Sequence, residues 1–269
     1  MVSLTGVSAG DTTVHYTECV NAENFPSSCI TARFAQRLEP HALLPHAEKL
    51  ELESVAPPPR RYFTGDVLME AGAPVDYIFL ILDGFACRYR LLPDGRRQIV
   101  ALMLPGDLCD TRTFVLPHMD HSICALSPVE AIPFSAGTIR DLERLAGLAG
   151  AFVWSSVIQQ SISREWLMNV GHRTAFERVG HLLCEVYERL GAVGLTRANS
   201  CNFPLTQSEV ADILALSTVH VNRTLMELRR AGLVTLRGHQ LTLNNYPALC
   251  AAIGFDADYL RARHPDCRH

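Results

Sequence analysis

The chain has 269 residues, of which 48% are hydrophobic and 19% charged, and its formal net charge is −4. This length and apolar content allow one large or two modest domains with a real core, and they exclude global disorder. No run of about 18 apolar residues occurs, and residues 1–10 carry neither a basic flank nor a long apolar stretch, so we expect no membrane span and no secretory signal. We therefore expect a cytoplasmic protein whose nine cysteines, none spaced as CxxC, are thiols.

The first part of the chain predicts an arm followed by short helices. Residues 1–32 are polar with little periodicity, so we interpret them as a loose N-terminal arm. From residue 33 to residue 52, apolar side chains suggest helical spacing that Pro40 and Pro45 interrupt. This stretch therefore predicts several short helices.

Residues 60–136 change to a pattern that is typical of β-structure. Short apolar runs, such as residues 77–82, alternate with turn signals such as Asp83-Gly84 and Pro93-Asp94-Gly95. This alternation predicts antiparallel hairpins. Many short strands at regular spacing indicate a sandwich or jelly-roll barrel, which we expect to form a domain over residues 33–136.

A long helical pattern follows. Residues 136–170 contain only Gly147 and Gly150 as early breakers, and their apolar side chains recur at helical spacing. Such a segment is either a core helix or a coiled-coil-like seam between two protomers, and we favour a dimerisation helix over residues 137–171 because a compact barrel leaves it little to pack on. The predicted interface residues are the apolar side chains Trp154, Ile158, Ile162 and Trp166.

The C-terminal region, residues 172–269, predicts a helix-turn-helix with a wing. A helix over residues 172–190 is followed by Thr206-Gln207-Ser208-Glu209, a capping box in which the Thr hydroxyl accepts from the Glu backbone N–H and the Glu carboxylate reaches back. The helix that starts there leads through a tight connection into a second helix near Ser217, whose hydroxyl can cap it. We expect Gly232 to end that second helix as a left-handed C-cap, and strands at 233–236 and 240–243 predict the wing.

The second helix of this pair carries side chains that suit DNA. A helix fits the major groove, where Arg matches guanine, Asn pairs with adenine and Val contacts the thymine methyl, while hydroxyls and His bond bases or phosphate. Residues 217–238 hold four Arg and one Glu, a local charge of +3 on an acidic chain, which suits phosphate contacts. The predicted DNA-contacting residues are Ser217, Thr218, Val219, His220, Asn222, Arg223, Arg230 and Arg237.

Two other classes of function compete with DNA binding. One is a cyclic-nucleotide-like ligand-binding barrel that acts as a signalling module and does not bind DNA; a basic, exposed face around Asn222 and Arg223 would argue against it. The other is an enzyme, which ranks last because the sequence shows no nucleophile–base–orienter set, no phosphate-binding Gly loop and no zinc motif. We therefore predict no catalytic residues and no metal site.

These motifs together resemble the family of cyclic-AMP receptor and FNR regulators (CRP/FNR), nearer to its FNR/FixK branch, over residues 33–246. The matching segments are residues 65–72, 82–84, 94–98, 104–107, 132–134 and 216–223. The resemblance implies an α+β protein with an N-terminal β-jelly-roll, cyclic-nucleotide-binding-like domain, a long dimerisation helix and a C-terminal winged helix-turn-helix. It also implies a homodimer that binds a two-fold symmetric promoter site in double-stranded DNA, with RNA polymerase as a partner.

The chain departs from the family at the positions that bind cyclic nucleotides. Where members that bind them place a ribose-holding Glu and a phosphate-neutralising Arg, this sequence carries Thr111 and His121. A buried phosphate without a cation is costly, so we expect no response to cyclic AMP.

The chain also lacks the full cysteine set of the oxygen-sensing branch. A third N-terminal cysteine is missing, and Glu130-Ala131 stand where the barrel cysteine would lie. We therefore expect no cofactor, and an unknown redox, gas or small-molecule effector. The alternatives are an iron–sulfur cluster on an unfamiliar set drawn from Cys19, Cys29, Cys87, Cys109 and Cys124, or haem bound near His118 and His121. The predicted sensing residues are Cys19, Cys29 and Cys109.

Overall fold

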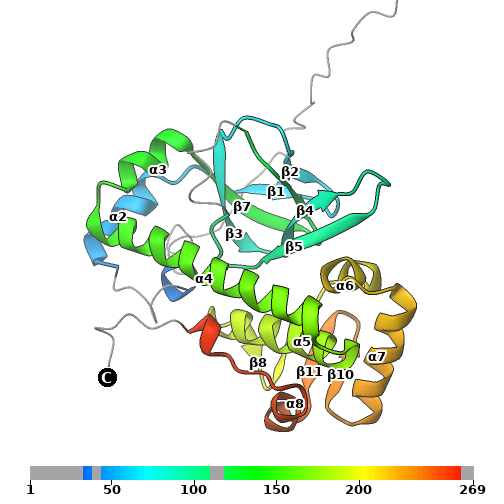
Figure 1. Ribbon diagram of the computed structural model, residues 1–269. Helices are drawn as coiled ribbons and strands as arrows, with labels where there is room; N and C mark the ends of the chain where they lie inside the picture. Colours follow the sequence, from blue (N-terminus) through cyan, green and yellow to red (C-terminus); the bar gives the residue numbers. More distant parts are fainter. Residues whose placement is uncertain (1–32, 38–43, 110–117, 262–269) are drawn as a thin grey trace, which may run out of the picture.

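The computed structural model describes residues 33–37, 44–109 and 118–261. In Figure 1, helix α4 crosses the molecule with the strands β1 to β7 above it and helices α5 and α8 below it. The predicted N-terminal arm lies outside the described residues. One sheet of the N-terminal half has the order β1-β7-β3 and the other has the order β2-β6-β4-β5. Their bounds are β1 (Arg60–Tyr62), β2 (Val67–Met69), β3 (Tyr77–Asp83), β4 (Ala86–Leu91), β5 (Arg97–Met103), β6 (Ser122–Ala125) and β7 (Val129–Ser135).

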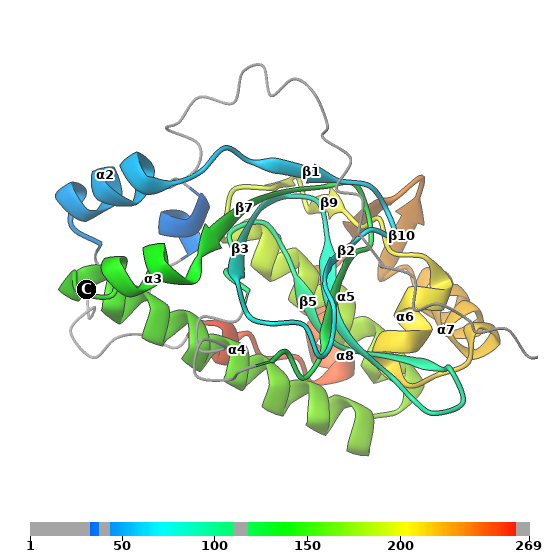
Figure 2. The same ribbon diagram turned by 90° about the horizontal axis from the view of Figure 1, so that it is seen from above.

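Helices flank this barrel, which Figure 2 shows from above. They are α2 (His46–Val55), α3 (Ala136–Leu142) and α4 (Ala146–His172). Successive side chains of a strand point to opposite faces, so each strand can contribute to two cores. In β3, Phe79 and Ile81 pack in the core between the two sheets, while Ile78, Leu80 and Leu82 pack with residues of α2, α3 and α4.

The helical region over residues 136–170 is two helices, which corrects the prediction of one long segment. α3 and α4 are bent by 116° relative to each other. Glu48 of α2 accepts hydrogen bonds from the backbone N–H groups of Gly147 (3.2 Å) and Leu148 (2.7 Å), so a residue distant in sequence caps α4. A side chain at Gly147 would bring its Cβ to 2.6 Å from Pro45 Cδ, and glycine permits this close approach.

No single helix among the described residues combines the length and apolar character that a membrane span needs. The bent pair of α3 and α4 reaches that length and composition when its two helices are taken together.

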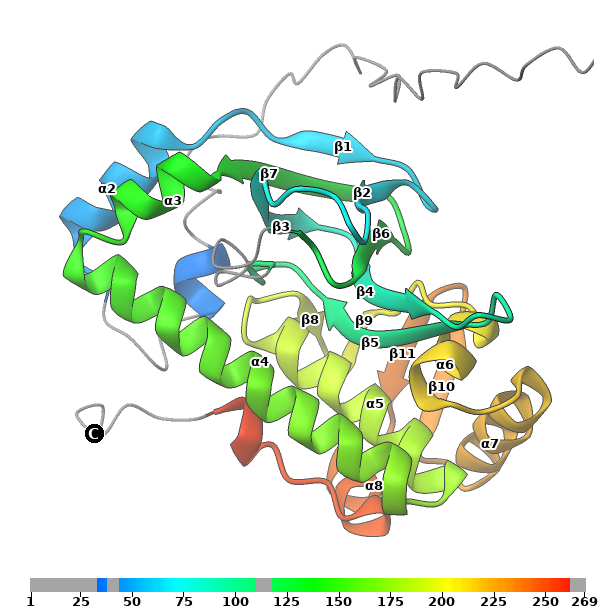
Figure 3. The same ribbon diagram turned by 45° about the horizontal axis from the view of Figure 1, so that its top comes forward.

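The C-terminal half contains the predicted helix-turn-helix inside a larger unit (Figure 3). Its elements are α5 (Ala175–Gly191), β8 (Thr196–Arg197), β9 (Ser200–Asn202), α6 (Gln207–Leu214), α7 (Thr218–Arg230), β10 (Val234–Arg237), β11 (Gln240–Leu243), α8 (Tyr246–Ile253) and the 3-10 turn η2 (Asp258–Leu260). The predicted capping box is confirmed: the backbone N–H of Glu209 donates to Thr206 Oγ1 (3.2 Å), and that of Thr206 donates to Glu209 Oε2 (2.7 Å). Gly232 follows α7 with a φ of +69°, the left-handed conformation predicted for it.

The wing is larger than predicted. The expected hairpin, β10 and β11, forms half of a four-stranded sheet with the order β10-β11-β9-β8. The strands β8 and β9 are two and three residues long, and they meet through Ala198 and Asn199, whose φ values of 47° and 60° suit a tight hairpin turn. Strands this short leave too little periodicity to be read from sequence. The α+β fold class is confirmed.

Candidate nucleic-acid interface

Helix α7 owes its position to a cap and a buried stripe. Ser217 precedes it and accepts a hydrogen bond from the backbone N–H of His220 (3.2 Å), the N-cap role the sequence suggested for it. Val221, Leu225 and Leu228 are buried in the core that α5 and α6 share. Burial of this stripe leaves the opposite face of α7 exposed.

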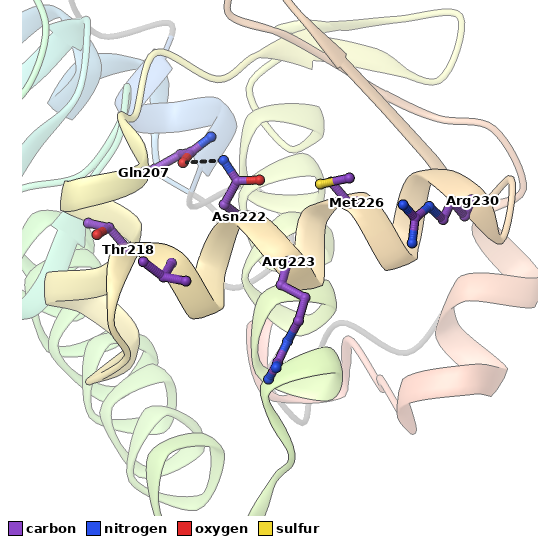
Figure 4. A pocket seen from close by; sticks show the side chains of 7 residues that line it. Gln207, Thr218, Asn222, Arg223, Met226 and Arg230 are labelled. Atoms are coloured by element: carbon purple, nitrogen blue, oxygen red, sulfur yellow. Dashed lines mark hydrogen bonds between the residues drawn. The ribbon is translucent and has the colours of Figure 1, made fainter.

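That exposed face forms a groove with the start of α6 (Figure 4). The groove has a volume of about 510 Å³. Its lining residues are Gln207, Thr218, Val219, Asn222, Arg223, Met226 and Arg230. Val219 is 78% exposed, so the groove presents an apolar side chain beside its polar ones.

The polar side chains of the groove are only loosely engaged within the protein. Arg223 Nε lies 3.9 Å from Glu227 Oε1, and both side chains are exposed. An exposed pair at this distance contributes at most about 1 kcal/mol, so the guanidinium can exchange it for a base or a phosphate. Asn222 Nδ2 donates to Gln207 Oε1 (3.1 Å), which ties α7 to the first turn of α6 (Figure 4).

The remaining predicted contact residues spread along α7 and the wing. His220 is half-buried, and Arg237 is exposed at the end of β10. Arg230 lines the groove. The neighbouring Arg229 donates from Nη2 to the carbonyl oxygen of Leu236 (3.1 Å) and so fastens α7 to the wing.

The sequence patterns did not point to two residues of the groove, Gln207 and Met226. Met226 lies four residues after Asn222, so helical spacing alone would have placed it on the same face. Gln207 belongs to α6, and its approach to Asn222 depends on how the two helices pack.

Polar contacts from the barrel position α6. Arg97 of β5 donates from Nε to Asp212 Oδ2 (2.9 Å). Gln98 Nε2 donates to the carbonyl oxygens of Asp212 (2.7 Å) and Ile213 (3.3 Å), near the C-terminal end of α6. The helix-turn-helix is therefore held against the outer face of the β2-β6-β4-β5 sheet.

The structure corrects the predicted dimer seam. Ile158, Ile162 and Trp166 are buried within one protomer, where they pack in the same core as α5, and Trp166 Nε1 donates to the buried Glu185. Trp154 is half-buried. The prediction of these interface residues was wrong because helical spacing shows which face of a helix is apolar but not which element covers that face. The apolar side chains of α4 that do face solvent are Val153, Leu167 and Met168, which are 49%, 74% and 53% exposed.

The structure describes only some of the residues considered for sensing or for nucleotide binding. Cys19, Cys29 and Thr111 lie outside the described residues. Cys109 is buried in the core between the two sheets, and His121 is buried with its Nδ1 2.7 Å from Asp120 Oδ1. Within the described ranges, no three His, Cys, Asp or Glu side chains gather as metal ligands would.

Comparison with known proteins agrees with both halves of the fold. Residues 59–144 match the model of the cyclic nucleotide-binding domain, and residues 177–252 match that of the Crp-like helix-turn-helix domain. The transcriptional activator protein FnrL of Cereibacter sphaeroides is 26% identical over 206 residues, which are 74% of this chain and 82% of FnrL. The nitrogen fixation regulation protein FixK of Bradyrhizobium diazoefficiens is 30% identical over 157 residues, 58% of this chain and 65% of FixK.

Among solved structures, FixK2 from Bradyrhizobium japonicum superposes with a TM-score of 0.66 at 24% identity, covering 73% of this chain and 96% of FixK2. The fold and the exposed groove thus define a winged helix-turn-helix DNA-binding protein with a cyclic-nucleotide-binding-like barrel. The chain belongs to the CRP/FNR family, and it is a DNA-binding transcription regulator of that type.

Proposed function

We propose that this regulator acts as a cytoplasmic homodimer that reads a two-fold symmetric promoter site, with one α7 in each half-site, and that it works together with RNA polymerase. The observation that carries the proposal is the groove on α7, in which Asn222, Arg223 and Arg230 surround exposed apolar side chains. A ligand-binding module that does not bind DNA has no use for such a face.

Within this groove we assign base reading mainly to Arg223. Its side chain lies one turn into the helix and is 68% exposed. The paired N–H donors of its guanidinium match the O6 and N7 atoms of guanine. Val219, at the most exposed apolar position, suits a thymine methyl group, and Asn222 or His220 adds a hydrogen bond. Arg230 and Arg237, farther along, suit phosphates.

The dimer is proposed on the solvent-exposed side of α4. Val153, Val157, Arg164 and Leu167 follow one another at steps of four, seven and three residues, and Met168 is adjacent. Steps of this kind keep side chains on one face of a supercoiled helix pair. A second copy of α4 would cover the exposed apolar atoms of Val153, Leu167 and Met168.

The signal is proposed to be a redox change, a gas or a small molecule other than cyclic AMP, with no iron–sulfur cluster or haem. The space between the sheets is filled by apolar side chains that include Phe79, Met103 and Met119. His121, at the position of the phosphate-binding Arg of the family, is engaged with Asp120. A phosphate group bound at this position would lack a cation dedicated to neutralising its charge.

Selection of bound sites from random duplex DNA tests the proposal. The wild-type protein should select an inverted repeat with half-sites about 10 base pairs apart, centre to centre. On that operator, Arg223→Ala should lose discrimination at one base position, a cost of about 1–3 kcal/mol. Arg230→Ala is the matched control, because it should weaken all sequences alike.

Failure to select any site, with no retention on heparin, would favour the signalling module instead. Unchanged base discrimination in Arg223→Ala would show that the assigned docking of α7 is wrong.

Calorimetry that detects micromolar binding of cyclic AMP, together with tighter operator binding, would contradict the proposed signal. Anaerobic purification that yields about four iron per chain, as a [4Fe–4S] cluster requires, would contradict the proposed absence of a cluster.

A further inference from the structure

Two cysteines face each other on neighbouring strands of the barrel. Cys87 of β4 and Cys124 of β6 are directly paired in the antiparallel sheet, and their Sγ atoms lie 3.5 Å apart. Opposed residues of an antiparallel pair have Cα atoms about 4.5–5.5 Å apart, which falls within the range that a disulfide spans. Bond formation needs the sulfur atoms to approach by about 1.5 Å, from 3.5 Å to the length of an S–S bond.

The pair lies on the side of the barrel that meets the DNA-binding half. Cys87 and Cys124 pack in the same core as Ile213 and Leu214 of α6, on the outer face of their sheet. Arg97, which donates to Asp212 of α6, also interacts electrostatically with both sulfur groups. One guanidinium therefore connects the thiol pair to the helix that precedes α7.

We propose that Cys87 and Cys124 are a redox-switched dithiol, which a peroxide oxidises to a cross-strand disulfide. We further propose that this disulfide weakens operator binding by disturbing the contacts that hold α6 against the barrel. The inference rests on the proposed redox signal and names the thiols that sense it.

The two sulfur groups differ in a way that assigns their roles. The hydrogen bond with Cys87 lowers the pKa of Cys124 despite burial, and the charge of Arg97 acts in the same direction. The same hydrogen bond, together with burial, raises the pKa of Cys87. Cys124 retains 5% exposure, whereas Cys87 has none. Cys124, which has the lower pKa and the greater exposure of the two, is therefore assigned as the thiol that meets the oxidant, and Cys87 as the resolving thiol.

The chemistry balances with hydrogen peroxide as the oxidant. The Cys124 thiolate attacks one peroxide oxygen, the O–O bond breaks, and a sulfenic acid forms as the departing hydroxide takes up a proton and leaves as water. The Cys87 sulfur, having lost its proton, attacks the Cys124 sulfur; the S–S bond forms, the S–O bond breaks, and a second water leaves. The two thiols lose two electrons and two protons in total, and one peroxide is reduced to two waters.

Disulfide formation would disturb the contacts between the barrel and α6 through Arg97, which donates to Asp212. A disulfide carries no thiolate charge and is a weaker hydrogen-bond acceptor than a thiolate, so Arg97 loses its sulfur partner while the strands β4 and β6 are drawn together. We expect operator affinity to fall about tenfold, the size that follows from losing one hydrogen bond to a charged group.

The test uses the full-length protein. It is reduced, freed of reductant, exposed to hydrogen peroxide or buffer, and quenched with N-ethylmaleimide. Mass mapping of unreduced peptides should find a Cys87–Cys124 disulfide, and binding to the selected operator should weaken about tenfold and recover with dithiothreitol. Cys124→Ala should remove the response to peroxide, whereas Cys201→Ala, at a buried cysteine of the wing, should keep it.

The mapping in the wild-type protein does not depend on any variant folding well. Operator binding by the reduced protein reports separately on the proposed function. If the reduced protein binds but peroxide forms no Cys87–Cys124 disulfide, or forms it without changing affinity, the inference is wrong while the proposed function stands. A peroxide response that persists in a folded Cys124→Ala protein would also overturn it.

Discussion

Arg189 of α5 forms a buried ion pair with Asp107, which follows β5 in the barrel, and this pair is one of the contacts that join the two halves of the molecule. The guanidinium donates from Nη2 to Asp107 Oδ2 and to the carbonyl oxygen of Leu102 (2.9 Å), and from Nη1 to Glu185 (3.1 Å). Burial by itself would raise the pKa of Asp107, but the charges of Arg189 and Arg37 lower it overall. The carboxylate is therefore ionised and held by two cations.

Removal of one partner of this pair should be costly. Arg189→Met leaves the charge of Asp107 buried with one cation fewer, and we expect the free energy of unfolding to fall by about 3–5 kcal/mol. Chemical denaturation measures the change. The control is Arg144→Gln, which breaks an exposed ion pair with Asp141 and should cost less than about 1 kcal/mol. Equal losses in the two variants would mean that the buried pair contributes no more to stability than an exposed one.

Charges on the exposed side of α4 should separate the dimer. Val153→Glu combined with Leu167→Glu places like charges at positions that face solvent in one protomer, so the fold should survive while association fails. Light scattering should give the mass of a monomer, and operator affinity should collapse. Phe63→Glu, at an exposed apolar position between β1 and β2, should remain dimeric. A dimer that persists in the double variant would move the interface away from α4.

Acid should destabilise the protein through His181. Burial, assisted by the charge of Arg173, lowers the pKa of this side chain from 6.5 to about 4, against the opposing influence of Glu165. Between pH 6.5 and about pH 4, the unfolded chain therefore binds a proton at His181 that the folded chain does not bind. The free energy of unfolding consequently falls as the pH drops through this window, by up to about 3 kcal/mol.

The measurement for His181 is the free energy of unfolding as a function of pH. His181→Phe, next to the rings of Phe255 and Tyr259, should flatten the dependence in this window. His239→Gln, at an exposed position of the wing, is the control and should keep it. A wild-type profile that is flat between pH 6.5 and pH 4 would contradict the buried neutral histidine.

Arg229 and Arg230 should behave differently although they are adjacent. Arg230→Ala should weaken binding to every DNA sequence and reduce the salt dependence by about one released ion. Arg229→Ala removes the hydrogen bond to Leu236 and should cost about 1 kcal/mol of stability with little change in the salt slope. Salt titrations of operator binding and thermal unfolding distinguish the two. Identical salt slopes for both variants would place Arg229 on the DNA backbone.

Local chemistry made much of this molecule predictable. The capping box of Thr206 and Glu209 and the left-handed Gly232 depend on neighbours in sequence, and they occur as expected. The exposed face of α7, with Val219 and Arg223, follows in the same way, because helical spacing separates it from the buried stripe.

Contacts between distant segments escaped prediction. Spacing showed that α4 has an apolar stripe, but α5 and the barrel cover Ile158, Ile162 and Trp166, and the apolar side chains that stay exposed lie on a different face. The break before α4 depends on Glu48, almost one hundred positions earlier, and the pairing of Cys87 with Cys124 depends on strand register. Periodicity reports which side of an element is apolar, whereas the partner that buries it is chosen by packing and by the pairing of charges across the whole chain.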